Sequence, residues 1–283
     1  MDACSSSSRP TPSVPGGPNE HFATEAEAAR ALGIVVRTID HDALTAGDVR
    51  VAVRLVDEPS DDAVYREWMV RSEHYDLLGH ALVARDVRLR ASPADYRRAH
   101  ELPGWYDAFS GLTPESRWLA SAGVDGIDVL LRGFPAGAAV LKDYVKSMKH
   151  RWDEAAFIPN TEDTAAVRSV ATRFLELRGD DLVGGIVIRK FESFVGAEAR
   201  TWWVRGVCRL VTAHPDSPDA PPAAGIPVND IAHAVATLAA PFVTVDFAQS
   251  ADGRWRIVEV GDGQVSDRPI STDPAELIAA LQS

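Results

Sequence analysis

The sequence is poor in cysteine and has no long apolar run, and these absences limit the kinds of protein it can encode. Only Cys4 and Cys208 occur among 283 residues, so no disulfide framework is expected, and a reducing compartment fits this usage. No run of about 18 apolar residues occurs, so no membrane-spanning helix is expected. The N-terminus also lacks the apolar stretch of a signal peptide. The sequence therefore predicts a cytoplasmic protein without a membrane partner.

Basic residues are fewer than acidic ones, with 29 Lys and Arg against 41 Asp and Glu. The resulting net charge of −12 argues against bulk attraction to nucleic acid or to an anionic membrane. The sequence also lacks a Walker-type glycine-rich phosphate loop, a Ser-His-Asp spacing and a metal-binding cluster of cysteines. A phosphate ligand would therefore need a local basic cluster.

The order of the segments predicts an α+β protein in which a small lobe precedes a larger domain. Residues 1–20 are rich in Ser, Pro and Gly and are predicted to form a disordered leader. Residues 21–95 alternate between helical and strand patterns, which predicts a small α/β lobe. Its helices are expected over 24–32 and 72–86, and its strands over 34–39, 49–56, 63–70 and 87–90. In the larger α+β lobe that follows, Thr113-Pro114 is expected to start a helix.

A hairpin is predicted where VDFAQS and RWRIVEV flank Asp252-Gly253, because this dipeptide favours a two-residue type I′ turn. Counting back from that turn places Phe247 opposite Val258 and Asp246 opposite Glu259. Opposed carboxylates lie roughly 5 Å apart and repel each other. A bound divalent cation such as Mg²⁺ would offset the repulsion; two screened acids on a solvated hairpin are the alternative.

A basic cluster lies in LKDYVKSMKHRW, within an otherwise apolar strand. Lys142 and Lys146 share one face of that strand, and Lys149 lies just beyond. Ammonium groups at this density favour a triphosphate ligand. An edge strand protected by lysines is the alternative.

Three further polar positions carry weaker signals. Glu198 and Arg200 share a strand face, where they could bind a ribose and an anion or simply form an ion pair. Arg71 lies at the start of a helix, a position suited to an anion, although a surface arginine is the alternative. His100, in RRAHELPGWY, is predicted to be structural.

Three segments occur in one order: AVLKDYVKSMKHRWDEAAFIPN, GGIVIRKFESFVGAEAR and VTVDFAQSADGRWRIVEVGDGQVS. Together they resemble the ATP-grasp superfamily, in particular a compact clade of bacterial and phage members, over about residues 60–270. The resemblance implies an ATP-grasp domain over 96–283, with a nucleotide held between two α+β subdomains and a linker near 186–196. The small α/β lobe would precede this domain.

The resemblance also implies ATP and Mg²⁺ as cofactors and assigns roles to individual residues. The phosphates would be bound by Lys142, Lys146 and Lys149, the adenine would lie beside Arg189, Lys190 and Phe191, and Glu198 would face the ribose. Asp246 and Glu259 would hold magnesium. The family's asparagine two positions later is Gly261 here, so Asp262 or Gln264 would supply that oxygen. Arg200, Lys146 and Arg71 would act in catalysis, at the acyl phosphate or the substrate carboxylate.

The activity implied by the resemblance is that of an ATP-dependent carboxylate–amine ligase. Such an enzyme forms an acyl phosphate, joins it to an amine as an amide or peptide bond, and releases ADP and phosphate. Its partners would be small-molecule or peptide carboxylates and amines, and a homodimer is the default assembly. Two alternatives are an ATP-grasp kinase that stops at phosphoryl transfer and a nucleotide-binding regulatory module without turnover.

Overall fold

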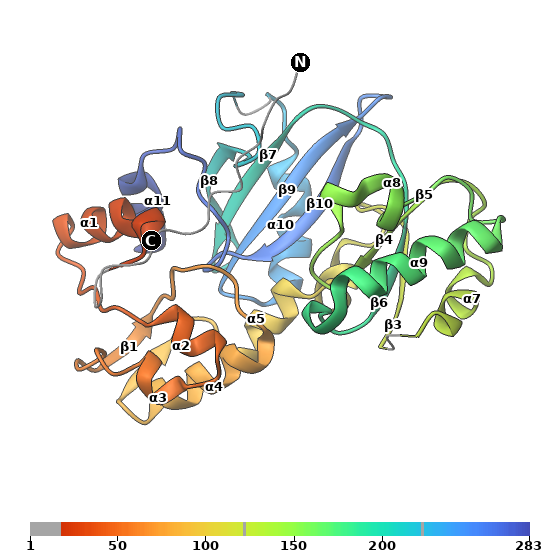
Figure 1. Cartoon of the computed structure of the whole chain (residues 1–283). Coiled ribbons are helices and arrows are strands. Elements are labelled where there is room, and N and C mark those ends of the chain that lie inside the picture. The colour runs from red at the N-terminus through yellow and green to blue at the C-terminus, as the bar shows by residue number, and fades with distance from the viewer. Residues whose placement is uncertain (1–17, 121–122, 222–223) are drawn as a thin grey trace, which may run out of the picture. The chain divides into compact units, whose positions relative to one another are not determined.

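The computed structural model describes residues 18–120, 123–221 and 224–283 (Figure 1). Most of the predicted leader lies outside these residues. The chain forms two compact units, one made of the residues up to Pro93 together with Thr272–Ser283, and the other of Ala94–Ser271. The sequence analysis grouped the last residues with the larger domain. Here they belong to the first unit because the C-terminal helix packs against the first α-helix.

The first unit is a small α/β lobe built on a pair of parallel strands. Its elements are η1 (Glu20–Phe22), α1 (Ala23–Ala31), α2 (His41–Thr45), α3 (Val49–Ala52), β1 (Ser60–Ala63), α4 (Ser72–Val83), β2 (Val87–Leu89) and α11 (Pro274–Leu281). Helix α4 connects the two strands and buries Tyr75, Leu78 and Leu82. Within the described residues, no helix of either unit is both long and apolar enough to cross a membrane.

The strands expected over 34–39, 49–56 and 63–70 are wrong, whereas the helices over 24–32 and 72–86 and the strand over 87–90 are close to the observed elements. Residues 49–56 alternate like a strand, but Asp48 accepts a hydrogen bond from the Val51 N–H (3.3 Å) and begins a helix. The buried positions Ala52, Val53 and Val56 follow helical spacing. Tertiary packing therefore overrides the local β-propensity.

The second unit contains two four-stranded sheets, in the orders β3-β6-β4-β5 and β10-β9-β7-β8, whose neighbouring strands are antiparallel. Its helices are α5 (Pro93–His100, which begins at the boundary), α6 (Leu102–Trp105), η2 (Tyr106–Phe109), α7 (Asp125–Leu131), η3 (Lys149–Arg151), α8 (Trp152–Ala155), α9 (Thr164–Arg178), η4 (Gly179–Asp181) and α10 (Val228–Leu238). Its strands are β3 (Ser116–Leu119), β4 (Ala139–Asp143), β5 (Phe157–Ile158), β6 (Ile186–Lys190), β7 (Phe194–Val204), β8 (Val207–Ala213), β9 (Phe242–Ser250) and β10 (Trp255–Asp262). Thr113-Pro114 therefore precedes strand β3 and does not start a helix.

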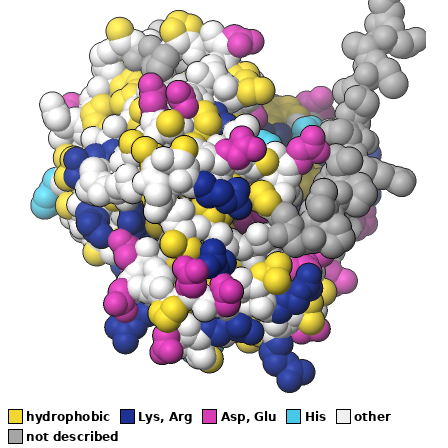
Figure 2. All heavy atoms as spheres, turned by 90° about the vertical axis from the view of Figure 1, so that its left-hand side faces the viewer, with side chains coloured by type: hydrophobic (Ala, Val, Ile, Leu, Met, Phe, Trp, Pro, Cys, Tyr) yellow, Lys and Arg dark blue, Asp and Glu magenta, His cyan; other side chains and the backbone are white. Residues whose placement is uncertain are grey.

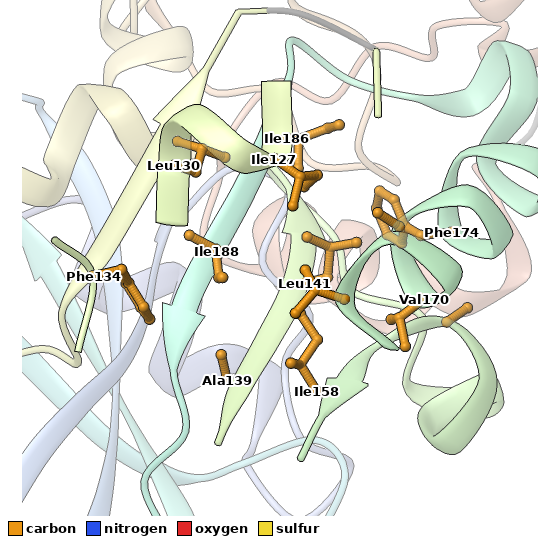
Figure 3. Packing of buried hydrophobic residues seen from close by; sticks show 13 residues of the cluster. Ile127, Leu130, Phe134, Ala139, Leu141, Ile158, Val170, Phe174, Ile186 and Ile188 are labelled. Atoms are coloured by element: carbon orange, nitrogen blue, oxygen red, sulfur yellow. The ribbon is translucent and has the colours of Figure 1, made fainter. Parts of the chain in front are cut away.

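The sheet that contains β4 packs its apolar face under α7 and α9. Helix α9 begins after Asp163, whose carboxylate accepts a hydrogen bond from the Ala166 N–H (3.0 Å), and its apolar residues recur at helical spacing. Figure 3 shows side chains of the two helices against those of β4, β5 and β6. The members of this core with the lowest exposure include Ile127, Leu141, Ile158, Phe174 and Ile188. This core fixes the position of β4, the strand that carries Lys142.

The chain passes from this sheet to the second between Lys190 and Phe194. Helix α10 packs against β8 of the second sheet. On the face of the molecule shown in Figure 2, basic and acidic side chains are interspersed, as the composition leads one to expect.

The β9–β10 hairpin differs from its predicted form in two places that cancel. The turn has three residues between Ser250 and Arg254, with Gly253 at φ 84° and its N–H bonded to the Ser250 carbonyl, so it is not the type I′ turn. This moves the pairing by one residue, and Phe247 lies opposite Ile257. A bulge between Ile257 and Glu259 then moves it back.

Candidate functional site

A row of polar side chains crosses the second sheet. Four adjacent strands contribute Thr212, Arg200, Asp246 and Glu259 in register. The predicted pairing of Asp246 with Glu259 is therefore present, although the turn that led to it is not. The first three residues are buried and Glu259 is half-buried.

Asp246 and Arg200 form a two-bond ion pair at the centre of this row. Arg200 Nε donates to Asp246 Oδ1 and Nη2 to Oδ2, both at 2.8 Å, and Nη1 donates to the Asp267 carbonyl at 2.8 Å. Burial by itself would raise the pKa of Asp246, but the Arg200 guanidinium holds that pKa well below its usual range. The carboxylate is therefore ionised at neutral pH, as a metal ligand must be.

This ion pair predicts a pH-dependent loss of stability in Asp246→Asn. Because the folded pKa of Asp246 is depressed, its stabilising contribution is complete above the unfolded value of about 3.9 and is lost as the pH falls below it. At pH 7 the variant should be less stable by about 3 kcal/mol, since Arg200 is left buried without its partner. Urea unfolding from pH 7 to pH 2.5 should show this difference narrowing in acid. Asp219→Asn, at an exposed position, should show neither effect.

His214 is a functional candidate that the sequence analysis did not assign. Its Nδ1 accepts a hydrogen bond from the Asp216 N–H (3.1 Å), so in the neutral ring the proton is on Nε2. That nitrogen lies 3.5 Å from Asp246 Oδ2 and 3.8 Å from Glu198 Oε2. Its signal in the sequence was the two-residue spacing from Thr212, which puts both on the polar face.

Lys142 is the most unusual group of the site. Its side chain is 9% exposed, and within the described part of the chain its ammonium forms no hydrogen bond or ion pair. Burial lowers the pKa of Lys142, and the negative charge of Glu259 opposes that change. Glu259 likewise forms no side-chain hydrogen bond or ion pair with any described residue. A buried cation and a nearby carboxylate thus remain without direct protein partners.

The turn after β4 carries Lys146 and is tied down by Asp143, which is fully buried. One carboxylate oxygen accepts the N–H groups of Val145 (2.7 Å) and Lys146 (2.6 Å). The other accepts from Arg178 Nη2 (2.7 Å) and the Val183 N–H (3.3 Å). Lys146 therefore projects, exposed, from a braced turn.

Lys149 lies beyond this turn and reaches the loop that follows β8. Its ammonium is 3.6 Å from Asp216 Oδ2, with both side chains largely exposed. Because the Asp216 backbone also binds His214, this contact brings the lysine segment next to the polar row. The structure thus gathers Lys142, Lys149, Glu198 and the polar row around one site.

The linker residues predicted beside adenine have different surroundings. Lys190 is exposed. Phe191, 37% exposed, lies edge-on to Phe157 (5.3 Å between ring centroids) and 6.2 Å from Trp152. Arg189 points to the other sheet: Nη1 donates to the Val258 carbonyl (2.7 Å), and Nη2 to Thr113 Oγ1 (2.6 Å) and the Ile257 carbonyl (3.2 Å). Arg189 therefore holds the β10 bulge that positions Glu259.

Replacing Arg189 with lysine should destabilise the protein by about 2–3 kcal/mol. A lysine cannot reproduce the guanidinium fork, so carbonyls at the bulge lose a charged donor in a buried place. Urea unfolding at pH 7 would measure the change. The matched variant Arg209→Lys, on an exposed position of β8, should stay within about 0.5 kcal/mol of the wild type. Equal stability of the two variants would contradict this role of Arg189.

The position of Gly261 explains why a larger residue is absent there. A Cβ atom on it would lie 3.1 Å from Thr244 Oγ1 and 3.2 Å from Ser266 Oγ, and these two hydroxyls are 2.7 Å apart. Asp262, the predicted third metal ligand, is fully buried. Its Oδ1 accepts the Gln264 backbone N–H (2.9 Å) and side-chain amide (3.2 Å). By strand alternation Asp262 lies on the face opposite Glu259.

Two findings limit how a metal could be held. Within the described ranges, no group of three or more His, Cys, Asp and Glu side chains is placed to bind a metal ion. The paired acids Asp246 and Glu259 still suit Mg²⁺, because that ion usually takes one or two carboxylates and completes its shell with phosphate oxygens and water. Arg71 lies in the first unit, at the N-cap position of α4.

Comparison with known proteins identifies the fold and the family. No curated protein matches the chain. Among solved structures, the RimK domain protein ATP-grasp from Sphaerobacter thermophilus DSM 20745 is 15% identical and covers 93% of each chain at a TM-score of 0.61. D-cycloserine synthetase DcsG is 16% identical over 92% of this chain and 93% of its own (TM-score 0.56). ATP-grasp ligase PsnB, complexed with minimal precursor, Mg and ADP, is 12% identical over 94% and 95% (TM-score 0.51).

At these identities the solved structures establish the fold, which is the expected α+β ATP-grasp fold with an N-terminal α/β lobe. A sequence profile of an ATP-grasp domain family, the third family of its clade, matches residues 131–281. This range is more than half of the chain and contains the lysine segment, the linker and the acidic hairpin. The chain therefore belongs to this family of ATP-grasp domains.

Proposed function

We propose that this protein is an ATP-dependent carboxylate–amine ligase that works through an acyl phosphate and forms an amide or peptide bond. The observation that carries the proposal is Lys142, a buried ammonium whose side chain has no hydrogen-bond or ion-pair partner among the described residues. Burying a charge without a partner is costly, so such a group is best explained by an anionic ligand. A nucleotide phosphate chain is the anion that an ATP-grasp domain takes.

The charges around Lys142 fit a magnesium nucleotide. Lys142, Lys146 and Lys149 would bind the phosphates as point charges. Asp246 and Glu259 would hold Mg²⁺, which when bound neutralises charge on the transferring phosphoryl group. All donor nitrogens of Arg200 are engaged by Asp246, Asp267 and its contact with His214. We therefore assign Arg200 to orienting Asp246 and keeping it ionised, in place of a direct contact with substrate.

In the proposed reaction a substrate carboxylate oxygen attacks the γ-phosphorus of ATP, and the bond to the β–γ bridging oxygen breaks to give an acyl phosphate and ADP. An amine then attacks the acyl carbon, and phosphate leaves as the amine loses a proton. The residues of this chain would contribute mainly placement and charge stabilisation. His214 and Glu198, beside Asp246, would line the side where the organic substrates enter.

The test is ADP release by the full chain with Mg²⁺ and ATP, screened over amino acids, peptides and other carboxylate–amine pairs, with product masses measured. The expected result is ADP formation that requires both a carboxylate and an amine, with a product lighter than the sum of the two by one water. Phosphorylated product formed without an amine would assign a kinase. Nucleotide binding without turnover across the panel would favour a regulatory module.

A further inference from the structure

His100 ends helix α5 and is held next to the lysine turn. Its ring lies against the buried ring of Tyr96, with centroids 5.0 Å apart and planes at 33°. Two residues later, the Leu102 N–H donates to the carbonyl of Tyr144 at 2.8 Å. Tyr144 belongs to the turn between Asp143 and Lys146, so the end of α5 is bonded to the segment that presents Lys146.

The electrostatic surroundings of His100 are those of an anion site. Burial, together with the positive charges of Lys146 and Lys142, lowers the pKa of His100 to about 4. The ring is therefore neutral at pH 7 and carries one N–H donor. Its nitrogens form no hydrogen bond with any described residue, and the side chain is partly exposed. A structural histidine, the prediction from sequence, would be expected to use its ring nitrogens.

The position of this group is fixed before any ligand binds. Asp143 braces the turn through four hydrogen bonds, and the Leu102–Tyr144 bond joins that turn to α5. Lys142, Lys146 and His100 consequently converge as a preformed set. Two ammonium groups already repel each other there, so a neutral N–H adds a donor without adding to the repulsion.

We propose that His100 binds the phosphate chain of the nucleotide as a third group beside Lys142 and Lys146, donating a hydrogen bond to a phosphate oxygen. This inference rests on the proposed nucleotide site. It assigns a ligand contact to a residue of the RRAHELPGWY segment. Hydrogen bonds to charged groups change affinities by factors of about ten or more.

The test compares His100→Ala and His100→Gln with the wild type by calorimetric titration with MgADP and with inorganic tripolyphosphate. His100→Ala should weaken both ligands about tenfold, and His100→Gln, which keeps an N–H donor, should recover part of that loss. His233→Ala, at an exposed position of α10, should bind like the wild type. In long-range ¹H–¹⁵N spectra of the wild type, the imidazole signals absent from His100→Gln should shift with tripolyphosphate and not with adenosine.

Circular dichroism of each variant shows whether it is folded, and the wild-type imidazole spectra provide a readout that needs no variant to bind. Wild-type affinity for both ligands in folded His100→Ala, or imidazole signals that do not move with tripolyphosphate, would overturn the role of His100 while leaving the nucleotide site intact. Failure of the wild type itself to bind MgADP would instead refute the proposed function, and the inference with it.

Discussion

Replacing Lys142 with methionine is expected to abolish nucleotide turnover while leaving the fold at least as stable as the wild type. Methionine fills a similar volume without the charge, so the cost of burying an unpartnered ammonium disappears. The melting temperature should stay the same or rise by a few degrees, about 2–4 °C per kcal/mol gained. MgADP affinity should fall at least about tenfold, and ADP formation by about 100-fold or more.

Calorimetric titration, thermal unfolding and an ADP-release assay measure the three quantities on the same preparations. Lys190→Met is the matched control, because Lys190 is exposed and lies at the end of the neighbouring strand β6. It should lose little of any quantity. If Lys142→Met were strongly destabilised and still bound MgADP normally, the buried lysine would be a structural group and the phosphate assignment would fail.

Replacing Glu259 with glutamine should remove nearly all Mg²⁺-dependent ADP formation, a loss of about 100-fold or more, without unfolding the protein. The substitution keeps the size of the side chain but removes one of the two carboxylates that face each other across β9 and β10. Repulsion between opposed acids is relieved, so stability should be unchanged or slightly higher. Raising the Mg²⁺ concentration should restore part of the activity, since fewer protein ligands mean weaker metal binding.

The experiment is a Mg²⁺ titration of ADP release for Glu259→Gln, the wild type and Glu162→Gln. Glu162 is exposed and precedes α9, so its variant should follow the wild-type curve. A Glu259→Gln protein with wild-type activity and the wild-type Mg²⁺ dependence would show that the metal, if one acts, is held elsewhere.

The facing acids could be predicted from sequence because strand periodicity is robust, but the reasoning about the turn was wrong in detail. The Asp252-Gly253 dipeptide suggested a two-residue turn, and the observed turn has three residues. The offset is undone by the bulge before Glu259. A bulge depends on distant contacts, here Arg189 and Thr113, which no local pattern reveals.

The same distinction explains the other differences. In the first unit, β-branched residues over 49–56 suggested a strand, and a capping aspartate with tertiary burial made a helix instead. Arg189 was assigned to the nucleotide because it lies in the linker strand, but the direction of a side chain between two sheets depends on the packing of both.

A signal for the lysines was available in the composition. Only four of the 29 basic residues are lysines, namely Lys142, Lys146, Lys149 and Lys190. In a chain that otherwise uses arginine for positive charge, three lysines within eight residues indicate a need for compact, strongly hydrated cations.

The contacts of the linker make the two sheets mechanically interdependent. Arg189 extends from β6 and grips the backbone beside Glu259, and Glu192 forms a two-bond ion pair with Arg256 of β10 (2.7 and 2.9 Å). Spreading the sheets apart would either rupture these bonds or drag the acid-bearing strand along. Any opening motion that admits a ligand would thus be felt at the carboxylates themselves, and the crossing segment would serve as a lever and not as a slack tether.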